Sequence, residues 1–357
     1  MRALPPTVIA GLVEPTPQHE RLFHALRDAG ATVSSLDTLP EIDATAQRTT
    51  APTTRDELAA ALAWARERAL ALPEARIGVV VENLAARRDE VIALAEELLA
   101  PDAALLADAS PLPFDISLGP PLAAVPLVVA ALDLIALGEG ALDADAAAAL
   151  LRSPYLPAAD IAWPLRARAE REWLEEGRTE VRIGDAVAAL DRRSDPLGQR
   201  WRGAREALRG RPRASPREWS DAWRGWLAAA GWPGTRTLDS GEYQARVAWE
   251  KLLVDFASLS AVAPRLSAAR ALSTLQSLAA ERRFQPEAWP APIQILGVLE
   301  GTGLAFDALW VAGLAAERWP AAPDPNPLLP IAWQRERNVA HASAEREREY
   351  ACRLTLR

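Results

Sequence analysis

The chain has 357 residues, of which 50% are hydrophobic and 25% are charged, so it is long enough for roughly two domains with sizeable cores. Its formal net charge is −8, and its single cysteine, Cys352, excludes an intrachain disulfide. The single lysine, Lys251, has no glycines around it, which excludes the Gly-Lys-Ser/Thr loop that binds nucleotide phosphates.

The composition also limits metal chemistry and location. The three histidines form no HExxH pair and no cysteine cluster exists, which argues against zinc hydrolysis. Trp249 stands where an acid-x-lysine nuclease core would place its acid before Lys251. No apolar run reaches the ~18 residues that cross a bilayer, so we expect no membrane contact. The lone cysteine and a start without a signal-like apolar core favour the cytoplasm.

The first 50 residues predict a strand–helix–strand unit. Thr7–Val13 is an apolar strand, Pro17–Ala29 is a helix ended by Gly30, and Ala31–Leu36 is a second strand. The polar segment Asp37–Thr54 contains two prolines and follows as a linker.

A second α/β unit begins after this linker. Thr54 and Glu57 form a capping box ahead of an alanine-rich helix that runs to about Leu72. Arg76–Glu82 is the clearest strand in the sequence, and a helix over Ala85–Leu99 follows it.

The middle of the chain, from about Leu122 to Arg283, reads as all-helical. Ser215–Glu218 has a serine cap, a proline at the first helical position and a glutamate at the third, which predicts a helix start. Asp239 opens a long amphipathic helix to about Val262, and Ser267–Arg283 is the next helix. No fixed-period repeat occurs, which disfavours a solenoid.

Within this middle part, the segment 192–217 holds nine arginines and two acidic residues. Arginines pair with phosphates and aromatic rings stack on bases, so the segment is a candidate DNA-facing surface. The arginines that would carry it are Arg200, Arg202, Arg205, Arg209, Arg211 and Arg213. The alternative is a solvated helix face above a core. Trp219, Trp223 and Trp226 have the i, i+4, i+7 spacing of one helix face, which favours a core position for these rings.

Two apolar strands near the end of the chain organise the rest of it. Ile293–Val298 and Ala308–Ala312 lie around a glycine-bearing turn, and their near-continuous apolar character is typical of a parallel sheet covered on both faces. Loops at the carboxyl ends of such strands hold ligands in open α/β sheets. A charged helix, His341–Arg357, ends the sequence.

The turn between these strands carries a family resemblance, through Gly297, Leu299, Thr302, Gly303, Leu304, Ala305, Phe306 and Asp307. The pattern resembles the fifth conserved block of superfamily 1 helicases, in the form found in RecB-, RecC- and AddB-type helicase–nuclease subunits. Gly303, Leu304 and Phe306 match the structural positions of that block. Its polar residues are replaced, with leucine for histidine, threonine for lysine and alanine for glutamate.

The resemblance extends over most of the chain. Arg76–Leu99 is similar to the start of the second motor lobe, where an arginine can reach the nucleotide phosphates. The resemblance implies a degenerate nucleotide-binding site formed by Arg87, Arg88, Thr302 and Gly303. The alternative is that Arg87 and Arg88 are solvated charges near a helix start and have no role in nucleotide binding.

Other motor positions are also altered. Ala10 stands where the family has a magnesium-binding aspartate, and Glu14 is a nearby acid that could substitute for it. At the sixth block Thr355 is followed by Leu356 in place of the catalytic arginine. We therefore assign no catalytic residue and no metal ligand. ATP and magnesium are expected only in a longer protein of which this chain is a piece.

Together these observations predict an α/β fold, a RecA-like parallel-sheet lobe of the helicase C-terminal type with a large all-helical insertion. Residues 1–50 would be a remnant of the first lobe, 51–120 and 290–357 the second lobe, and 121–289 the insertion. The expected function is DNA binding in a catalytically degenerate part of a repair or recombination helicase–nuclease, with a partner subunit. The alternatives are one lobe of an active ATP-dependent translocase and an interaction scaffold without DNA contact.

Overall fold

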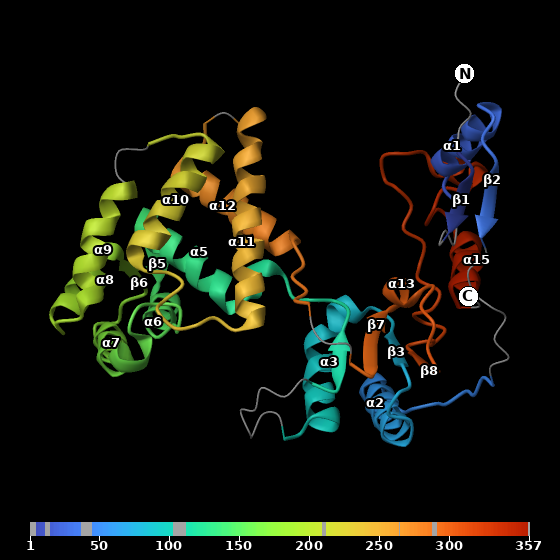
Figure 1. Ribbon diagram of the computed structural model, residues 1–357, viewed down its shortest axis with the longest axis horizontal. Helices are drawn as coiled ribbons and strands as arrows, with labels where there is room; N and C mark the ends of the chain where they lie inside the picture. Colours follow the sequence, from blue (N-terminus) through green and yellow to red (C-terminus); the bar gives the residue numbers. More distant parts are fainter. Residues whose placement is uncertain are drawn as a thin grey trace. The chain divides into compact units, whose positions relative to one another are not determined.

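The computed structural model describes residues 5–10, 15–36, 45–102, 112–208, 212–263, 265–287 and 291–355 (Figure 1). The chain is an α/β protein that divides into two compact units. Met1–Leu118 and Ala288–Arg357 form one unit, which contains a parallel sheet and is called the sheet unit here. Gly119–Glu287 forms the other, which is mostly helical and is called the helical unit.

The centre of the sheet unit is a four-stranded sheet in the order β4-β7-β3-β8, all parallel. Its strands are β3 (Ile77–Val81), β4 (Phe114–Ile116), β7 (Ile293–Gly297) and β8 (Ala308–Ala312). Val79 of β3 pairs with Ile295 of β7 on one side and with Trp310 of β8 on the other. Strands from both ends of the sequence therefore pair directly, with the whole helical unit between β4 and β7 in the chain.

One face of this sheet is packed against α2 (Thr54–Ala71) and α3 (Leu84–Leu99). Ile77, Val79 and Val81 alternate along β3 and join the apolar residues of both helices in one buried cluster. Helix α2 begins one residue earlier than the sequence pattern predicted, because Thr53 is its N-cap and accepts a hydrogen bond from Asp56 N at 3.1 Å.

The other face is covered by the chain between β7 and β8. Val80 lies under α13 (Val298–Gly301), where a Cβ on Gly301 would approach Val80 Cγ2 to 3.0 Å. The ring of Phe306 and the end of Leu309 lie over Gly78, at 3.0 and 2.8 Å from the position of a Cβ. The sequence predicted a parallel sheet covered on both faces. Leu309 is still half-exposed, so this face is less completely covered than predicted.

The chain starts and ends with smaller elements of the sheet unit. Near the N-terminus, β1 (Thr7–Ala10) and β2 (Val33–Leu36) are parallel partners, with α1 (Pro17–Asp28) between them in sequence. The predicted continuation of the first strand to residue 13, and Glu14, lie outside the described residues. Near the C-terminus come α14 (Ile331–Glu336) and α15 (Ala344–Thr355).

The helical unit is built around α5 (Pro126–Glu139), a nearly all-apolar helix that contacts most of its neighbours. Its remaining helices are α6 (Ala144–Leu151), α7 (Ala159–Glu175), α8 (Ile183–Asp191), α9 (Pro196–Ala204), α10 (Pro216–Ala230), α11 (Ser240–Ser258) and α12 (Ala268–Glu281), with short 3-10 turns at Leu122–Ala124, Arg205–Leu208 and Leu259–Ala261. The all-helical prediction missed β5 (Ala141–Asp143) and β6 (Glu180–Arg182), an antiparallel pair too short to leave an alternating pattern.

The predicted start signals in this unit are confirmed. Ser215 and Asp239 each form a capping box, at the starts of α10 and α11. Trp219, Trp223 and Trp226 are fully buried on one face of α10, as their spacing indicated. Among the described residues, no helix combines the length and the apolar character needed to pass through a bilayer.

Candidate functional site

The first candidate site is the edge of the sheet where the parallel strands end. Gly313 follows β8 with a φ of 92°, and a Cβ there would lie 2.7 Å from Glu82 Cβ at the end of β3. Its N–H donates a hydrogen bond to Glu57 Oε1 at 3.0 Å. A carboxylate from the first turn of α2 therefore ties the exit of β8 to that helix, while Gly313 permits the close approach to Glu82.

Arg87 lies in the first turns of α3 at this edge and is mostly buried. Its Nε donates to Glu90 Oε2 at 2.9 Å, and its Nη2 donates to Thr54 O at 3.1 Å. The hydrogen bond from Arg87 is the main cause that lowers the pKa of Glu90, with smaller contributions from the charges of Arg55 and Arg318. Arg87 thus joins the starts of α2 and α3 and is also one of three arginines around one carboxylate.

Arg88 is turned toward the exit of β4. Its Nε donates to Leu118 O at 2.7 Å, and it forms an ion pair with Asp89 at 3.9 Å. Beside Leu118, Ser117 Oγ is buried without a hydrogen-bond partner among the described residues. Both arginines of the expected nucleotide-binding set are therefore near the carboxyl edge, and both are bonded to their own unit.

The other two members of that set lie in the turn after β7. Thr302 Oγ1 donates to Val298 O at 2.8 Å and so closes α13, while Gly303 has a φ of 80° with open space where a Cβ would lie. Asp307 Oδ2 accepts from Arg76 N at 2.8 Å, and Asp307 N donates to Arg76 O at 2.9 Å. The turn is therefore held by structural contacts, and Thr302 stands where the helicase block that the sequence resembles has lysine.

The second candidate site is the arginine-rich segment of the helical unit. Arg200 Nε donates to Ala229 O at 2.7 Å at the end of α10, and Arg202 is ion-paired with Asp191. Arg213 Nη2 donates to Arg265 O at 3.1 Å. Arg205 is exposed, and Arg209 and Arg211 lie outside the described residues. Three of the six predicted DNA-contacting arginines therefore have partners within the helical unit.

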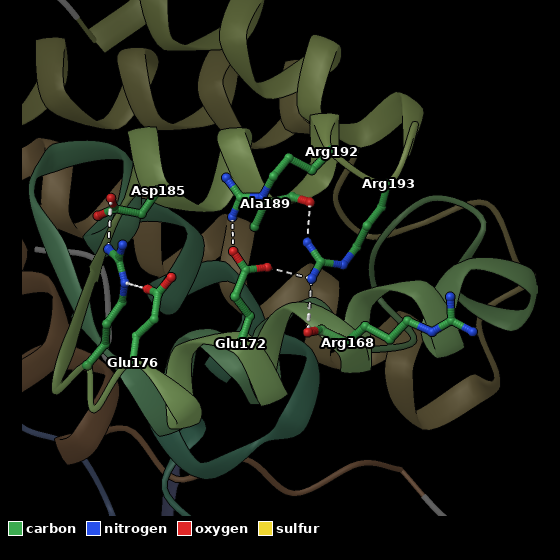
Figure 2. A network of polar contacts seen from close by, with 8 residues as sticks. Arg168, Glu172, Glu176, Asp185, Ala189, Arg192 and Arg193 are labelled. Atoms are coloured by element: carbon green, nitrogen blue, oxygen red, sulfur yellow. Dashed lines mark hydrogen bonds and ion pairs between the residues drawn. The ribbon is translucent and has the colours of Figure 1, made fainter.

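Two further arginines of the segment tie α8 to α7 (Figure 2). Glu172 accepts from both Arg192 and Arg193, and Arg193 also donates to Ala189 O at 2.7 Å and to Arg168 O at 3.0 Å. The hydrogen bond from Arg193 is the main cause that lowers the pKa of Glu172. These contacts connect helices to one another. The number of arginines in the segment is therefore larger than the number available to contact DNA.

The buried tryptophans of α10 also make hydrogen bonds within the helical unit. Their indole N–H groups donate to Leu266 O at 3.0 Å, Glu139 Oε1 at 2.9 Å and Leu134 O at 2.8 Å. They belong to the core and offer no face for stacking.

Sequence reasoning missed the contacts made by Glu57, Gly313 and Arg76, because their partners lie more than 200 residues away in the chain. Within the described part of the chain, no group of three or more His, Cys, Asp and Glu side chains is placed to hold a metal ion. Comparison with protein-family models and with curated protein sequences found no match to this chain.

Proposed function

We propose that this chain is a RecA-like lobe with a helical insertion, and that it binds DNA as a catalytically degenerate part of a helicase–nuclease. The observation that supports this most is the direct parallel pairing of β3 with β7, with the helical unit inserted between β4 and β7. A helicase-type second lobe interrupted by an insertion has this arrangement.

The contacts at the carboxyl edge support the degenerate part of the proposal. Phosphoryl transfer depends on cationic groups that are free to meet the transferred phosphate. Here Arg87 and Arg88 are bonded to Glu90, Thr54 O and Leu118 O, and Thr302 bonds to its own helix. We therefore propose that the chain alone does not hydrolyse ATP.

DNA affinity measured against salt tests the proposal. Labelled single-stranded and duplex oligonucleotides are titrated with the full chain between about 50 and 200 mM salt, a range in which each phosphate contact adds to the fall of affinity with salt. We expect a shallow slope, of about one to three counterions, because much of the arginine segment is internally paired. Absence of binding at the lowest salt would contradict the proposal.

An interaction scaffold is the second candidate, and one observation favours it. Gln334 is buried and holds the loop before α14 by accepting from Asn326 N at 2.9 Å and donating to Asn326 O and Leu329 O at 2.8 Å. This fixed loop still presents Leu328, which is 89% exposed, beside the half-exposed Trp333. Ordered exposed apolar side chains are typical of protein contact surfaces, so a partner helicase–nuclease subunit fits here. A chain without DNA affinity at any salt is what this candidate predicts.

A further inference from the structure

The helical unit contains a hollow of about 450 Å³ that neither candidate site uses. It is lined by the end of α6, the turn that follows it, the first turns of α7 and the loop before α11. The residues that matter to its chemistry are Arg152, Leu156, Asp160, Trp163, Thr235 and Arg236. Its volume lies within the roughly 300–1,000 Å³ of typical small-ligand sites.

Two glycines close the wall that carries Thr235. Gly234 has a φ of 90°, and a Cβ there would lie 3.0 Å from Pro154 O. Gly231 has a φ of 96°, and a Cβ there would lie 2.3 Å from the ring of Pro157. Between them Trp232 is buried and donates to Leu127 O at 3.0 Å, in the core of the unit. The hollow is therefore held by backbone packing and exists before any ligand arrives.

Arg236 is fixed in position at one side of the hollow. Its guanidinium lies 5.2 Å from the centre of the Tyr155 ring and is ion-paired with Glu242, which also accepts from Tyr155 Oη at 3.0 Å. Burial first, and then the bond to Glu242, raises the pKa of Tyr155 to about 12, so the phenol stays a neutral donor. This arrangement holds the guanidinium on an aromatic face while its side chain remains 40% exposed.

Arg152 is a second cation of the hollow. It is ion-paired with Glu170 on α7, and its side chain is 38% exposed. Arg236 also donates to Thr237 O at 3.2 Å. The charges of both arginines are balanced by Glu170 and Glu242, but a guanidinium has five N–H donors and a carboxylate engages at most two of them side by side. Each arginine therefore offers its remaining N–H donors, and not a net charge, to a further acceptor. Asp160 is the remaining charge that lines the hollow, and its carboxylate accepts hydrogen bonds only.

Trp163 supplies a flat apolar surface beside these charges. Its side chain is on the first turns of α7 and is 53% exposed, in contrast to the buried tryptophans of α10. An indole that packs in no core and adjoins two fixed arginines has the combination that binds single-stranded nucleic acid, a stacking platform next to phosphate donors.

We propose that this hollow binds one unpaired nucleotide of single-stranded DNA, with the base stacked on Trp163 and the adjoining phosphate on Arg152 and Arg236. Asp160 and Thr235 offer an acceptor and a hydroxyl to the edge of the base. A base in a duplex cannot enter, because its faces and edge are already occupied by its neighbours and its pairing partner. This site rests on the proposed DNA-binding function and names the form of DNA that it takes.

Affinity for a labelled single-stranded oligonucleotide at low salt tests the site, with the full chain throughout. Trp163→Ala should weaken binding about tenfold, and Trp163→Phe should keep most of the affinity, because base–aromatic stacking is the interaction removed. Trp333→Ala changes a similarly exposed tryptophan of the sheet unit and should leave affinity unchanged.

Arg152→Gln tests the phosphate contact. It should lower affinity severalfold, because it removes the N–H donors that face the phosphate and leaves the Glu170 carboxylate without its ion pair. Because that pair is neutral, the slope of log affinity against log salt should change by no more than about 0.7, the value for one phosphate of a single strand. Arg178→Gln is its matched control, since Arg178 is similarly exposed and is ion-paired with Glu176 and Asp185 away from the hollow. Thermal unfolding checks that all variants are folded, as expected for exposed positions.

The outcomes separate the two proposals. A wild-type chain that binds neither single-stranded nor duplex DNA overturns both the site and the proposed function, and one that binds the duplex alone overturns the site. A chain that binds, with Trp163→Ala and Arg152→Gln equal to their controls, overturns the site alone. Equal competition by a duplex of the same length, or by polyglutamate, also overturns it, because the hollow would then be a general anion surface. A cross-link from an iodouracil-bearing single strand to Trp163, absent with the duplex, is the expected direct result.

Discussion

Two glycines of the sheet unit have a positive φ for different reasons. A Cβ on Gly313, at the exit of β8, would lie only 2.7 Å from Glu82 Cβ, whereas Gly303 makes its turn in open space. Both have a positive φ, a backbone conformation that residues other than glycine rarely adopt. The two positions therefore separate backbone strain from steric contact.

We expect Gly303→Ala to cost about 1 kcal/mol of unfolding free energy, from the positive φ alone. Gly313→Ala should cost more, about 2–4 kcal/mol, because the added methyl also meets the backbone-near atoms of Glu82. Urea unfolding followed by circular dichroism measures both. Equal losses at the two positions would show that the exits of β3 and β8 are not held as close as the structure places them.

A buried ion pair connects α7 to the residue before α9. Arg166 and Asp195 have side chains that are 1% and 2% exposed, joined at 2.8 Å, and Arg166 Nη2 donates to Pro157 O at 2.7 Å. Arg166 Nη1 is buried without a partner among the described residues. Asp195→Asn keeps the shape and removes the charge, so it should cost about 3–5 kcal/mol by leaving a buried cation uncompensated.

The double variant Arg166→Met/Asp195→Asn should recover part of that loss, because no charge is then buried. Glu175→Gln breaks the exposed pair with Arg171 and should change stability by less than about 1 kcal/mol. Chemical unfolding of the four proteins measures the difference. A double variant less stable than Asp195→Asn would mean that Arg166 stabilises the unit through its packing and not through the pair.

At the scale of elements, a helix or strand could be predicted from the sequence where its signals lie within a few residues of one another. The strand at Arg76–Glu82 and the caps at Ser215 and Asp239 were predicted, because a burial pattern and a cap lie within a few residues. The β4 strand was missed, since the apolar–polar–apolar alternation of Phe114–Ile116 covers only three residues, too few to identify a strand from sequence. For the candidate site at the sheet edge, the sequence predicted the place, at the carboxyl ends of the strands. It did not predict the hydrogen-bond partners of Arg87 and Arg88, because these partners are brought close only by tertiary folding.

Asp133 makes the stability of α5 depend on pH. Burial raises the pKa of this carboxyl to about 6, in a helix that is otherwise nearly apolar. The folded state therefore holds a proton that the unfolded state releases near pH 4, so this group favours folding below about pH 4 and the gain is lost as pH rises through about 6.

We expect Asp133→Asn to remove this dependence and to raise the melting temperature at about pH 7 to 8, where the wild-type carboxylate is charged and partly buried. At about pH 4 the two proteins should melt at nearly the same temperature. The effect is modest because the group keeps some contact with water. A variant that melts lower than wild type at the higher pH would contradict the role given to burial.

At the scale of the whole molecule, the helical unit has the features of an independent folding unit. Its apolar core, around α5, α10, α11 and α12, is separate from the cluster under the parallel sheet. Its two ends are hydrogen-bonded to each other, with Leu122 N donating to Arg282 O at 2.7 Å and Phe284 N donating to Pro120 O at 2.9 Å. An insertion closed in this way brings its entry and exit together without help from the sheet.

We therefore expect residues 119–287, expressed alone, to fold cooperatively. The fully buried Trp201, Trp219, Trp223, Trp226 and Trp249 all belong to this unit, so its fluorescence should be blue-shifted and should move to the red in a single urea transition. The same transition should appear in the full chain at a similar midpoint, because the core of the unit and the hydrogen bonds between its ends lie within residues 119–287. A red-shifted spectrum without a cooperative transition would mean that the unit depends on the sheet. In that case the insertion could not be a domain added to a complete lobe, and the proposed architecture would fail with it.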